Sequence, residues 1–239
     1  MRQSRFLLLP ACIVLLAACS PPAPQEAHSP PAEAAPSAAA VVEAAPATAT
    51  ATATVEDWTL PGTLGPTTTR AELEARFGKA NLREETRTGP EGEGEYAVLV
   101  AFPDDPQRRL ELVLGEGRQT LDRIEVSGAH SRWHEASGLR VGMPLAELVA
   151  LNGKPVGFLG LDWDYGGTVE DWHGGTLAND GATLFRSVML EAREGVGDDV
   201  ALPTGDGSFR SDDPQWPSIG KDLVVGKIGL GWPDGGDGN

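Results

Sequence analysis

The stretch LGLDWDYGGTVEDWHGG, residues 159–175, gathers carboxylates and aromatic rings within one short segment. Asp162, Asp164 and Gly166, followed by Glu170, partly match a calcium-binding loop, because oxygen ligands at alternate positions can wrap around a hard cation. The match is incomplete, since no third acidic residue precedes the glycine and the last carboxylate comes too early. Calcium binding is therefore one interpretation of the stretch, and the spacing does not favour it.

The same carboxylates allow a second interpretation, a carbohydrate-active hydrolase. Asp164 and Glu170 could act as general acid and base, while Trp163 and Trp172 could stack on a sugar ring. Paired carboxylates arise by chance in so acidic a chain, which contains 35 Asp and Glu residues. The hydrolase therefore remains an alternative with no further support in the sequence.

The third interpretation, which we favour, is packing and recognition. In a half-buried edge strand, Leu161, Trp163 and Tyr165 would line one face, and the two aspartates between them the other. Some aromatic rings would then pack a glycine-rich hairpin, and others would stay exposed for a partner. The candidate recognition surface consists of Trp163, Tyr165, Trp172, Asp162 and Asp164.

Histidine, serine and nucleotide chemistry find little support elsewhere. His130 and His134 stand four apart, which on a helix would suit a zinc site, but the flanking Ser and Gly residues indicate a connecting loop. No G-x-S-x-G nucleophile motif and no phosphate-binding glycine loop occurs. We therefore predict no catalytic residue, no metal site and no cofactor, and expect the protein not to be an enzyme.

The cysteines suggest an anchor. An apolar run from Phe6 to Ala18 follows Arg2 and Arg5, and it is too short to span a bilayer as a helix. This pattern is typical of a secretory signal peptide, here residues 1–18. Cys12 would leave with the signal, so Cys19 would be the one cysteine of the mature chain and no disulfide could form within it.

The residues Leu16, Ala17, Ala18 and Cys19 resemble the bacterial lipobox. The resemblance implies that Cys19 carries diacylglycerol and palmitate, becomes the mature N-terminus and holds the protein to a membrane through several acyl chains. Ser20 stands where an aspartate would favour retention at the inner membrane, so we expect an outer-membrane lipoprotein facing the periplasm. The alternative is an ordinary cleaved signal with a free Cys19.

Composition then separates a tether from a globular part. Residues 19–54 are almost entirely Ala, Pro, Thr, Ser and Glu, which favours an extended disordered linker. The formal net charge of −16 would repel phosphate backbones, so we expect no nucleic acid partner. The remaining chain is long enough for one sizeable core or two small ones.

Two segments of the globular part resemble each other. TRAELEARFGKA begins at Thr69 and PLAELVALNGKP at Pro144, and their matching residues keep a constant spacing of 75. Thr69 and Glu72 form a capping-box pattern, and Gly78 and Gly153 suit helix ends, so each segment predicts a short helix. We therefore expect a first repeat over residues 55–128 and a second over residues 129–239, ending in an acidic, glycine-rich tail.

Strand patterns follow each predicted helix. YAVLVAF (96–102), LELVL (110–114) and LDRIEV (121–126) are separated by turn formers and predict an antiparallel meander. In the second half, residues 156–167, 182–190 and 222–230 are the candidate strands. The sequence therefore predicts an α+β fold in two layers, built from a duplicated unit of short helix plus antiparallel β-meander.

The pattern GLRVGMPLAELVALNGKP, with Gly142, Met143, Glu147, Gly153 and Pro155, is similar to a motif of the small outer-membrane lipoproteins of the β-barrel assembly machine. Its tandem arrangement resembles the duplicated architecture of secreted β-lactamase-inhibitor proteins. These resemblances imply a fold and a general theme of protein binding. We expect a non-enzymatic scaffold or accessory protein of the outer membrane, with an inhibitor of a secreted or periplasmic enzyme as the alternative.

Overall fold

A computed structural model describes residues 58–92, 94–115, 117, 119–179, 183–197 and 199–232. The predicted signal peptide, Cys19, the linker and the last seven residues lie outside this part of the chain. The helices are α1 (Arg70–Phe77), α2 (Leu145–Asn152) and α3 (Ile219–Asp222), with short 3-10 turns at Lys79–Asn81 and Pro90–Gly92. The strands are β1 (Thr59–Leu60), β2 (Leu82–Thr88), β3 (Glu95–Ala101), β4 (Leu110–Leu114), β5 (Leu121–Ser127), β6 (His134–Glu135), β7 (Gly157–Leu159), β8 (Val169–Asp171), β9 (Phe185–Ala192), β10 (Ser208–Arg210) and β11 (Leu223–Gly231).

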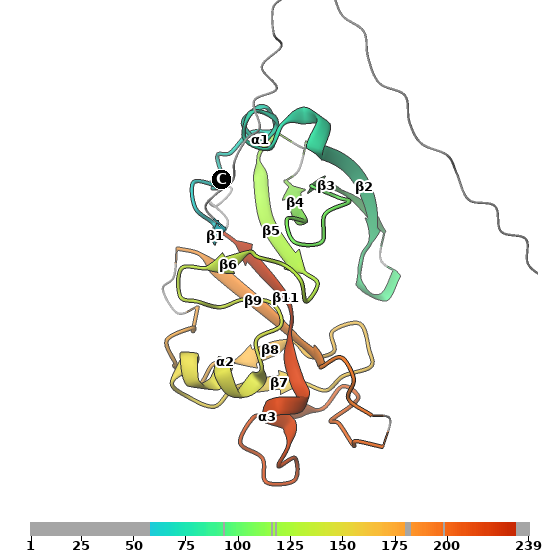
Figure 1. The fold of residues 1–239 in the computed structure, drawn as a ribbon, viewed down its shortest axis with the longest axis vertical. Coiled ribbons are helices and arrows are strands. Elements are labelled where there is room, and N and C mark those ends of the chain that lie inside the picture. Colours follow the sequence, from blue (N-terminus) through green and yellow to red (C-terminus); the bar gives the residue numbers. More distant parts are fainter. Residues whose placement is uncertain are drawn as a thin grey trace, which may run out of the picture. The chain divides into compact units, whose positions relative to one another are not determined.

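The main element is a six-stranded antiparallel sheet in the order β2-β3-β4-β5-β11-β9 (Figure 1). Its first four strands follow the chain, whereas β11 lies between β5 and β9 and so joins strands from both halves of the sequence. A three-stranded sheet, β10-β7-β8, and a parallel pair, β1-β6, complete the sheets of the described residues. The few helices and mostly antiparallel strands make a two-layer α+β fold.

The two predicted helices form at the expected positions. Thr69 accepts a hydrogen bond from the Glu72 backbone while the Glu72 side chain accepts one from the Thr69 backbone, which is the expected capping box. Both helices end at glycines with positive φ, Gly78 at 82° and Gly153 at 72°. Because such a φ strains other residues, glycine suits both helix ends.

The main core lies between the helices and one face of the six-stranded sheet, the inner face. Leu73 and Phe77 of α1 and Leu145 and Leu148 of α2 are fully buried there. The sheet contributes alternate residues to this core, among them Leu99, Leu110, Leu112, Ile124, Val126, Val188, Leu190, Val225, Ile228 and Leu230. The alternation follows from strand geometry and leaves the intervening residues on the opposite face, the outer face.

One of our strand predictions fails locally, and one strand was missed. Residues 160–167 were expected to continue a strand, but after β7 the chain forms successive turns, in which the Gly166 amide donates to the Trp163 carbonyl oxygen at 2.8 Å. At Gly160 a Cβ atom would lie 2.5 Å from the Gly205 carbonyl oxygen, so the neighbouring backbone packs too closely for a regular strand with side chains. Strand β2 was not predicted.

No helix in the described ranges has both the length and the apolar character needed to cross a membrane.

Candidate functional site

Four of the five residues of the predicted recognition surface, Asp162, Trp163, Asp164 and Tyr165, lie on the loop that joins β7 to β8. Trp163 and Tyr165 are 36% and 39% exposed, and their rings meet edge to face with centroids 5.3 Å apart. The Trp163 indole Nε1 donates to the Gly160 carbonyl oxygen at 2.9 Å. This hydrogen bond and the ring contact hold two partly exposed aromatic side chains in a defined geometry.

One aspartate of this loop, Asp164, is held by a backbone amide. An Asp164 carboxylate oxygen accepts a hydrogen bond of 2.6 Å from the backbone amide of Glu91, in the turn between β2 and β3. Glu91 and Asp162 both have positive φ values, 56° and 68°, which is uncommon for residues other than glycine. The contact therefore ties together two loops that are far apart in the sequence.

Trp172 does not belong to the exposed surface. It is 7% exposed and packs in the main core, and its carbonyl oxygen accepts a hydrogen bond from the Asn152 side chain at 3.0 Å. The structure therefore brings Trp163, Tyr165, Asp162 and Asp164 into one loop but excludes Trp172. At this exposure Trp172 is not part of the surface that Trp163 and Tyr165 form.

The candidate metal residues do not converge in the described ranges. No group of three or more His, Cys, Asp or Glu side chains there is arranged to hold a metal ion. His130 lies in a turn and His134 in β6, so the two do not share a helix face. The ring of His134 contacts the Arg132 carbonyl oxygen through Nδ1 and the Thr59 hydroxyl through Nε2.

A second surface, which the sequence analysis missed, is the outer face of the six-stranded sheet. The ladder register aligns its residues in rows across the strands, such as Glu85, Val98, Val113 and Arg123. No helix of the described residues contributes to this face, because the buried apolar residues of α1, α2 and α3 belong to the main core. The face consists of Arg83, Glu85, Arg87, Tyr96, Val98, Val100, Glu111, Val113, Arg123, Glu125, Ser127, Phe185, Ser187, Met189, Lys227, Gly229 and Gly231.

A small apolar cluster lies beneath the charged side chains of this face. Val98, Val100 and Val113 are 1%, 0% and 6% exposed, and Tyr96 packs against them, separate from the main core. Long Arg and Glu side chains can bury such residues with their aliphatic stems while keeping their charged ends in water. The outer face is therefore an ordered layer of charges over valine.

The charges on β2, on β4 and at Arg109 just before β4 form a cross-strand network. Arg87 bridges Glu85 at 2.9 Å and Glu111 at 2.6 Å, and Arg109 bridges the same two carboxylates at 3.2 and 2.9 Å. Arg83 adds a third contact to Glu85 at 3.0 Å. Two carboxylates are thus shared by three guanidinium groups, so each charge holds its neighbours in position.

The network determines how these carboxylates titrate. Partial burial would raise the pKa of Glu85, but hydrogen bonds from Arg87, Arg83 and Arg109 outweigh it and lower the pKa to about 2. Burial likewise opposes the lowering of the Glu111 pKa, which Arg87 and Arg109 produce. Both side chains are therefore ionised throughout the physiological pH range.

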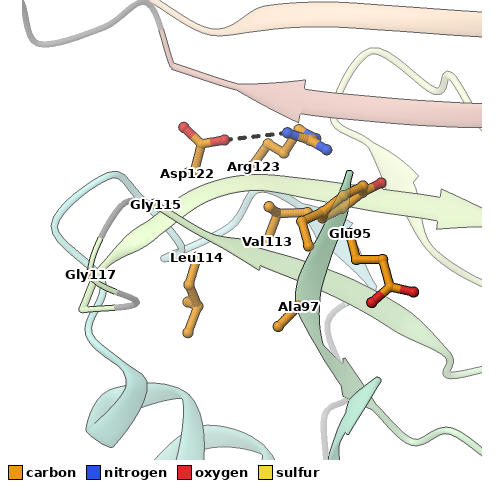
Figure 2. Close-up of a pocket in the computed structure, with 9 residues that line it drawn as sticks. Glu95, Ala97, Val113, Leu114, Gly115, Gly117, Asp122 and Arg123 are labelled. Atoms are coloured by element: carbon orange, nitrogen blue, oxygen red, sulfur yellow. Dashed lines mark hydrogen bonds and ion pairs between the residues drawn. The ribbon is translucent and has the colours of Figure 1, made fainter. Parts of the chain in front are cut away.

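The end of the outer face next to this network forms a hollow. A shallow pocket of about 530 Å³ is lined by β3, β4 and β5, and Figure 2 shows Glu95 and Ala97 on one side and Asp122 and Arg123 on another. Arg123 pairs with Glu125 at 2.7 Å and with Asp122 at 3.5 Å. Its guanidinium also lies 5.6 Å from the Tyr96 ring centre.

The far end of the face carries its most exposed apolar side chain. Phe185 is 54% exposed on β9, opposite Gly231 of β11. A Cβ at Gly229 would lie 2.3 Å from the Ser187 hydroxyl oxygen, so the Ser187 side chain occupies the space over this glycine of β11. The sequence LREETRT has charged residues at the alternate positions 83, 85 and 87, which is the signal for this face. Only the ladder register shows which charges on other strands they meet.

Comparisons with known proteins identify no family. No protein-family model matches the chain, and no curated protein matches it. Among solved structures, the chain is similar to the crystal structure of the uncharacterized protein yfeY from Escherichia coli, with 14% sequence identity and a TM-score of 0.37. The similarity covers 71% of this chain and 94% of that chain. A TM-score this low supports no statement about function.

Proposed function

We propose that this chain is a lipid-anchored protein of the bacterial outer membrane that acts by binding another protein and catalyses no reaction. The lipobox-like residues ending at Cys19 and the Ala/Pro-rich linker support the anchor. In this proposal the acyl chains hold Cys19 in the membrane, and the linker sets how far the folded part reaches into the periplasm.

The observation that carries the proposal is the outer face of the six-stranded sheet. Charged side chains on a face without helix cover would ordinarily adopt many conformations in solvent. Here Glu85 and Glu111 are held in place by shared guanidinium groups. Phe185 supplies an exposed aromatic anchor, and aromatic and arginine side chains carry much of the energy in protein interfaces. The occupant that fits is a folded protein surface with charges of both signs and an apolar pocket for Phe185.

We also propose that the fold arose from a duplicated unit. Helix α1 begins at Arg70 and α2 begins at Leu145, 75 residues later. The strands that follow them, β2 and β7, begin at Leu82 and Gly157, which is the same spacing. The residue before α1, Thr69, bridges Thr120 next to β5, and the residue before α2, Pro144, bridges Val224 in β11. These correspondences support two related units whose last strands pair with each other.

A second candidate is inhibition of a secreted or periplasmic enzyme. The exposed pair of Trp163 and Tyr165 favours it, because rigid aromatic side chains on a loop suit insertion into a groove. The hydrolase alternative has less support, since Trp172 is buried and an Asp164 oxygen already accepts the Glu91 amide.

Affinity capture from detergent-solubilised envelopes tests the proposal, with acylated protein as bait and Cys19→Ala as the control for the anchor. Phe185→Ala should reduce recovery of a stoichiometric partner about tenfold or more. The matched control is Arg140→Ala, which removes an exposed ion pair with Glu147 away from the outer face. A soluble hydrolase as partner would favour inhibition, and equal recovery with Phe185→Ala would contradict binding through the outer face.

A further inference from the structure

Strand β2 is the open edge of the six-stranded sheet. Among the described strands only β3 pairs with it. The hydrogen bonds from the Phe102 amide to the Asn81 carbonyl (2.8 Å) and from the Gly89 amide to the Gly94 carbonyl (3.0 Å) fix the phase of this ladder. Since antiparallel pairs alternate, residues 83, 85 and 87 bond to β3, and the backbone groups of Thr86 and Thr88 point away from the sheet.

We propose that β2 pairs with β2 of a second copy of this chain, antiparallel, about a two-fold axis at Thr86. In this register the two Thr86 residues form a hydrogen-bonded pair, using the backbone groups that point outward. Each Glu85 then lies opposite Arg87 of the other copy on the outer face. The edge is therefore self-complementary in both backbone phase and charge.

Neighbouring registers bring like charges together. A slip one way sets Glu85 opposite Glu85 and Arg83 opposite Arg87, and a slip the other way sets Arg87 opposite Arg87. A longer slip that centres Glu84 on its own copy also needs the Leu82 amide, which already donates to the Lys79 carbonyl. The charges of β2 thus select one register and disfavour the others.

The side chains of β2 can accommodate the second copy. Thr86 is exposed, and the paired threonines would meet as β-branched residues across the new strand boundary. Nη1 of Arg87 now donates to the Thr86 carbonyl oxygen at 3.2 Å, and on pairing this nitrogen would donate to Glu85 of the second copy while Nε and Nη2 keep their bonds within the chain. Pairing would extend the outer faces of both copies into one surface, independently of the partner proposed above.

Single cysteines test the register directly. The full chain with Cys12 and Cys19 both changed to alanine provides a background without other cysteines, since the sequence contains two. Thr86→Cys places the two sulfur-bearing residues about 5.5 Å apart across the axis, within disulfide range. The matched control, Thr88→Cys, shares the edge and its exposure but lies about 13 Å along the strand from its own copy.

Under mild oxidation we expect at least about tenfold more disulfide dimer from Thr86→Cys than from Thr88→Cys. Sedimentation of the cysteine-free chain should show a dimer that Thr86→Pro converts to monomer, because proline removes an amide that the β2–β3 ladder does not use. Far-UV circular dichroism should stay unchanged in all variants. Equal cross-linking of the two cysteine variants, or a dimer that survives Thr86→Pro, would overturn the proposal.

Discussion

The buried ion pair of Glu135 and Arg186 should be the most sensitive polar contact of the fold. The Glu135 and Arg186 side chains are 7% and 11% exposed. Arg186 donates to both carboxylate oxygens of Glu135, from Nε at 2.8 Å and from Nη2. Ser137 donates a further hydrogen bond to Glu135 at 3.0 Å. The pair links β6 to β9, so it joins two regions that are distant in the sequence.

Glu135→Gln removes the negative charge and leaves the guanidinium buried without its counterion. Breaking a buried pair in this way costs about 3–5 kcal/mol. Arg186 keeps its hydrogen bond to the Leu177 carbonyl at 2.8 Å, so we expect a loss near the lower end, about 3 kcal/mol. The double variant Glu135→Leu with Arg186→Met replaces the pair by apolar groups and should lie within about 1 kcal/mol of the parent chain.

Urea unfolding followed by circular dichroism measures these free energies, provided that the slope m stays constant between variants. Arg140→Gln is the control, because the Arg140–Glu147 pair is about half exposed on both sides and should contribute less than about 0.5 kcal/mol. A loss below about 1 kcal/mol for Glu135→Gln would refute the reasoning. So would a double variant as unstable as the two single changes added together.

Three further predictions concern the rest of the fold. The pKa of Glu85 falls from 4.5 to about 2 on folding, so its contribution is complete above pH 4.5 and is lost as the pH drops toward 2. Solvent screening reduces this contribution to on the order of 1–2 kcal/mol. The urea midpoint of Glu85→Gln should therefore lie below that of the parent chain at pH 5, and the difference between the two midpoints should be smaller at pH 3. Gly167→Ala should destabilise by at least about 2 kcal/mol in the same assay, because Gly167 has a φ of 77° and its Cβ would lie 2.0 Å from the Leu190 carbonyl oxygen; an unchanged midpoint would contradict this packing. Thr69→Ala removes the N-cap of α1 and should cost about 1 kcal/mol, whereas a neutral effect would show that the Glu72 half of the capping box suffices.

The elements with strong local signals could be predicted from sequence. Capping residues, terminal glycines and apolar spacing locate α1 and α2, and alternating apolar residues locate β3, β4 and β5. Strand β2 could not be predicted because LREETRT contains one apolar residue. This composition is typical of an edge strand that contributes few side chains to the core. Local periodicity therefore succeeds where a segment contributes its own face to the core.

The candidate site depended on contacts that local patterns do not encode. The loop at residues 160–167 resembles a strand in its alternation, but Gly160, Gly166 and Gly167 are each crowded by nearby backbone, so the loop folds back on itself. Trp172 resembles its neighbour Trp163 in the sequence, and only tertiary packing buries one and exposes the other. Likewise, the place of β11 between β5 and β9 depends on pairing between remote segments, which periodicity does not specify.

Lysine footprinting in intact envelopes tests the central claim most directly. Lys227 lies on the outer face with a side chain 44% exposed. Lys154 is exposed just after α2, whose buried apolar residues belong to the main core and not to the outer face. If the outer face holds a protein partner, acetylation of Lys227 should be several-fold slower in envelopes than in the purified protein, while Lys154 reacts at the same rate in both. Equal reactivity of Lys227 in the two preparations would contradict the proposal that this face is the binding surface.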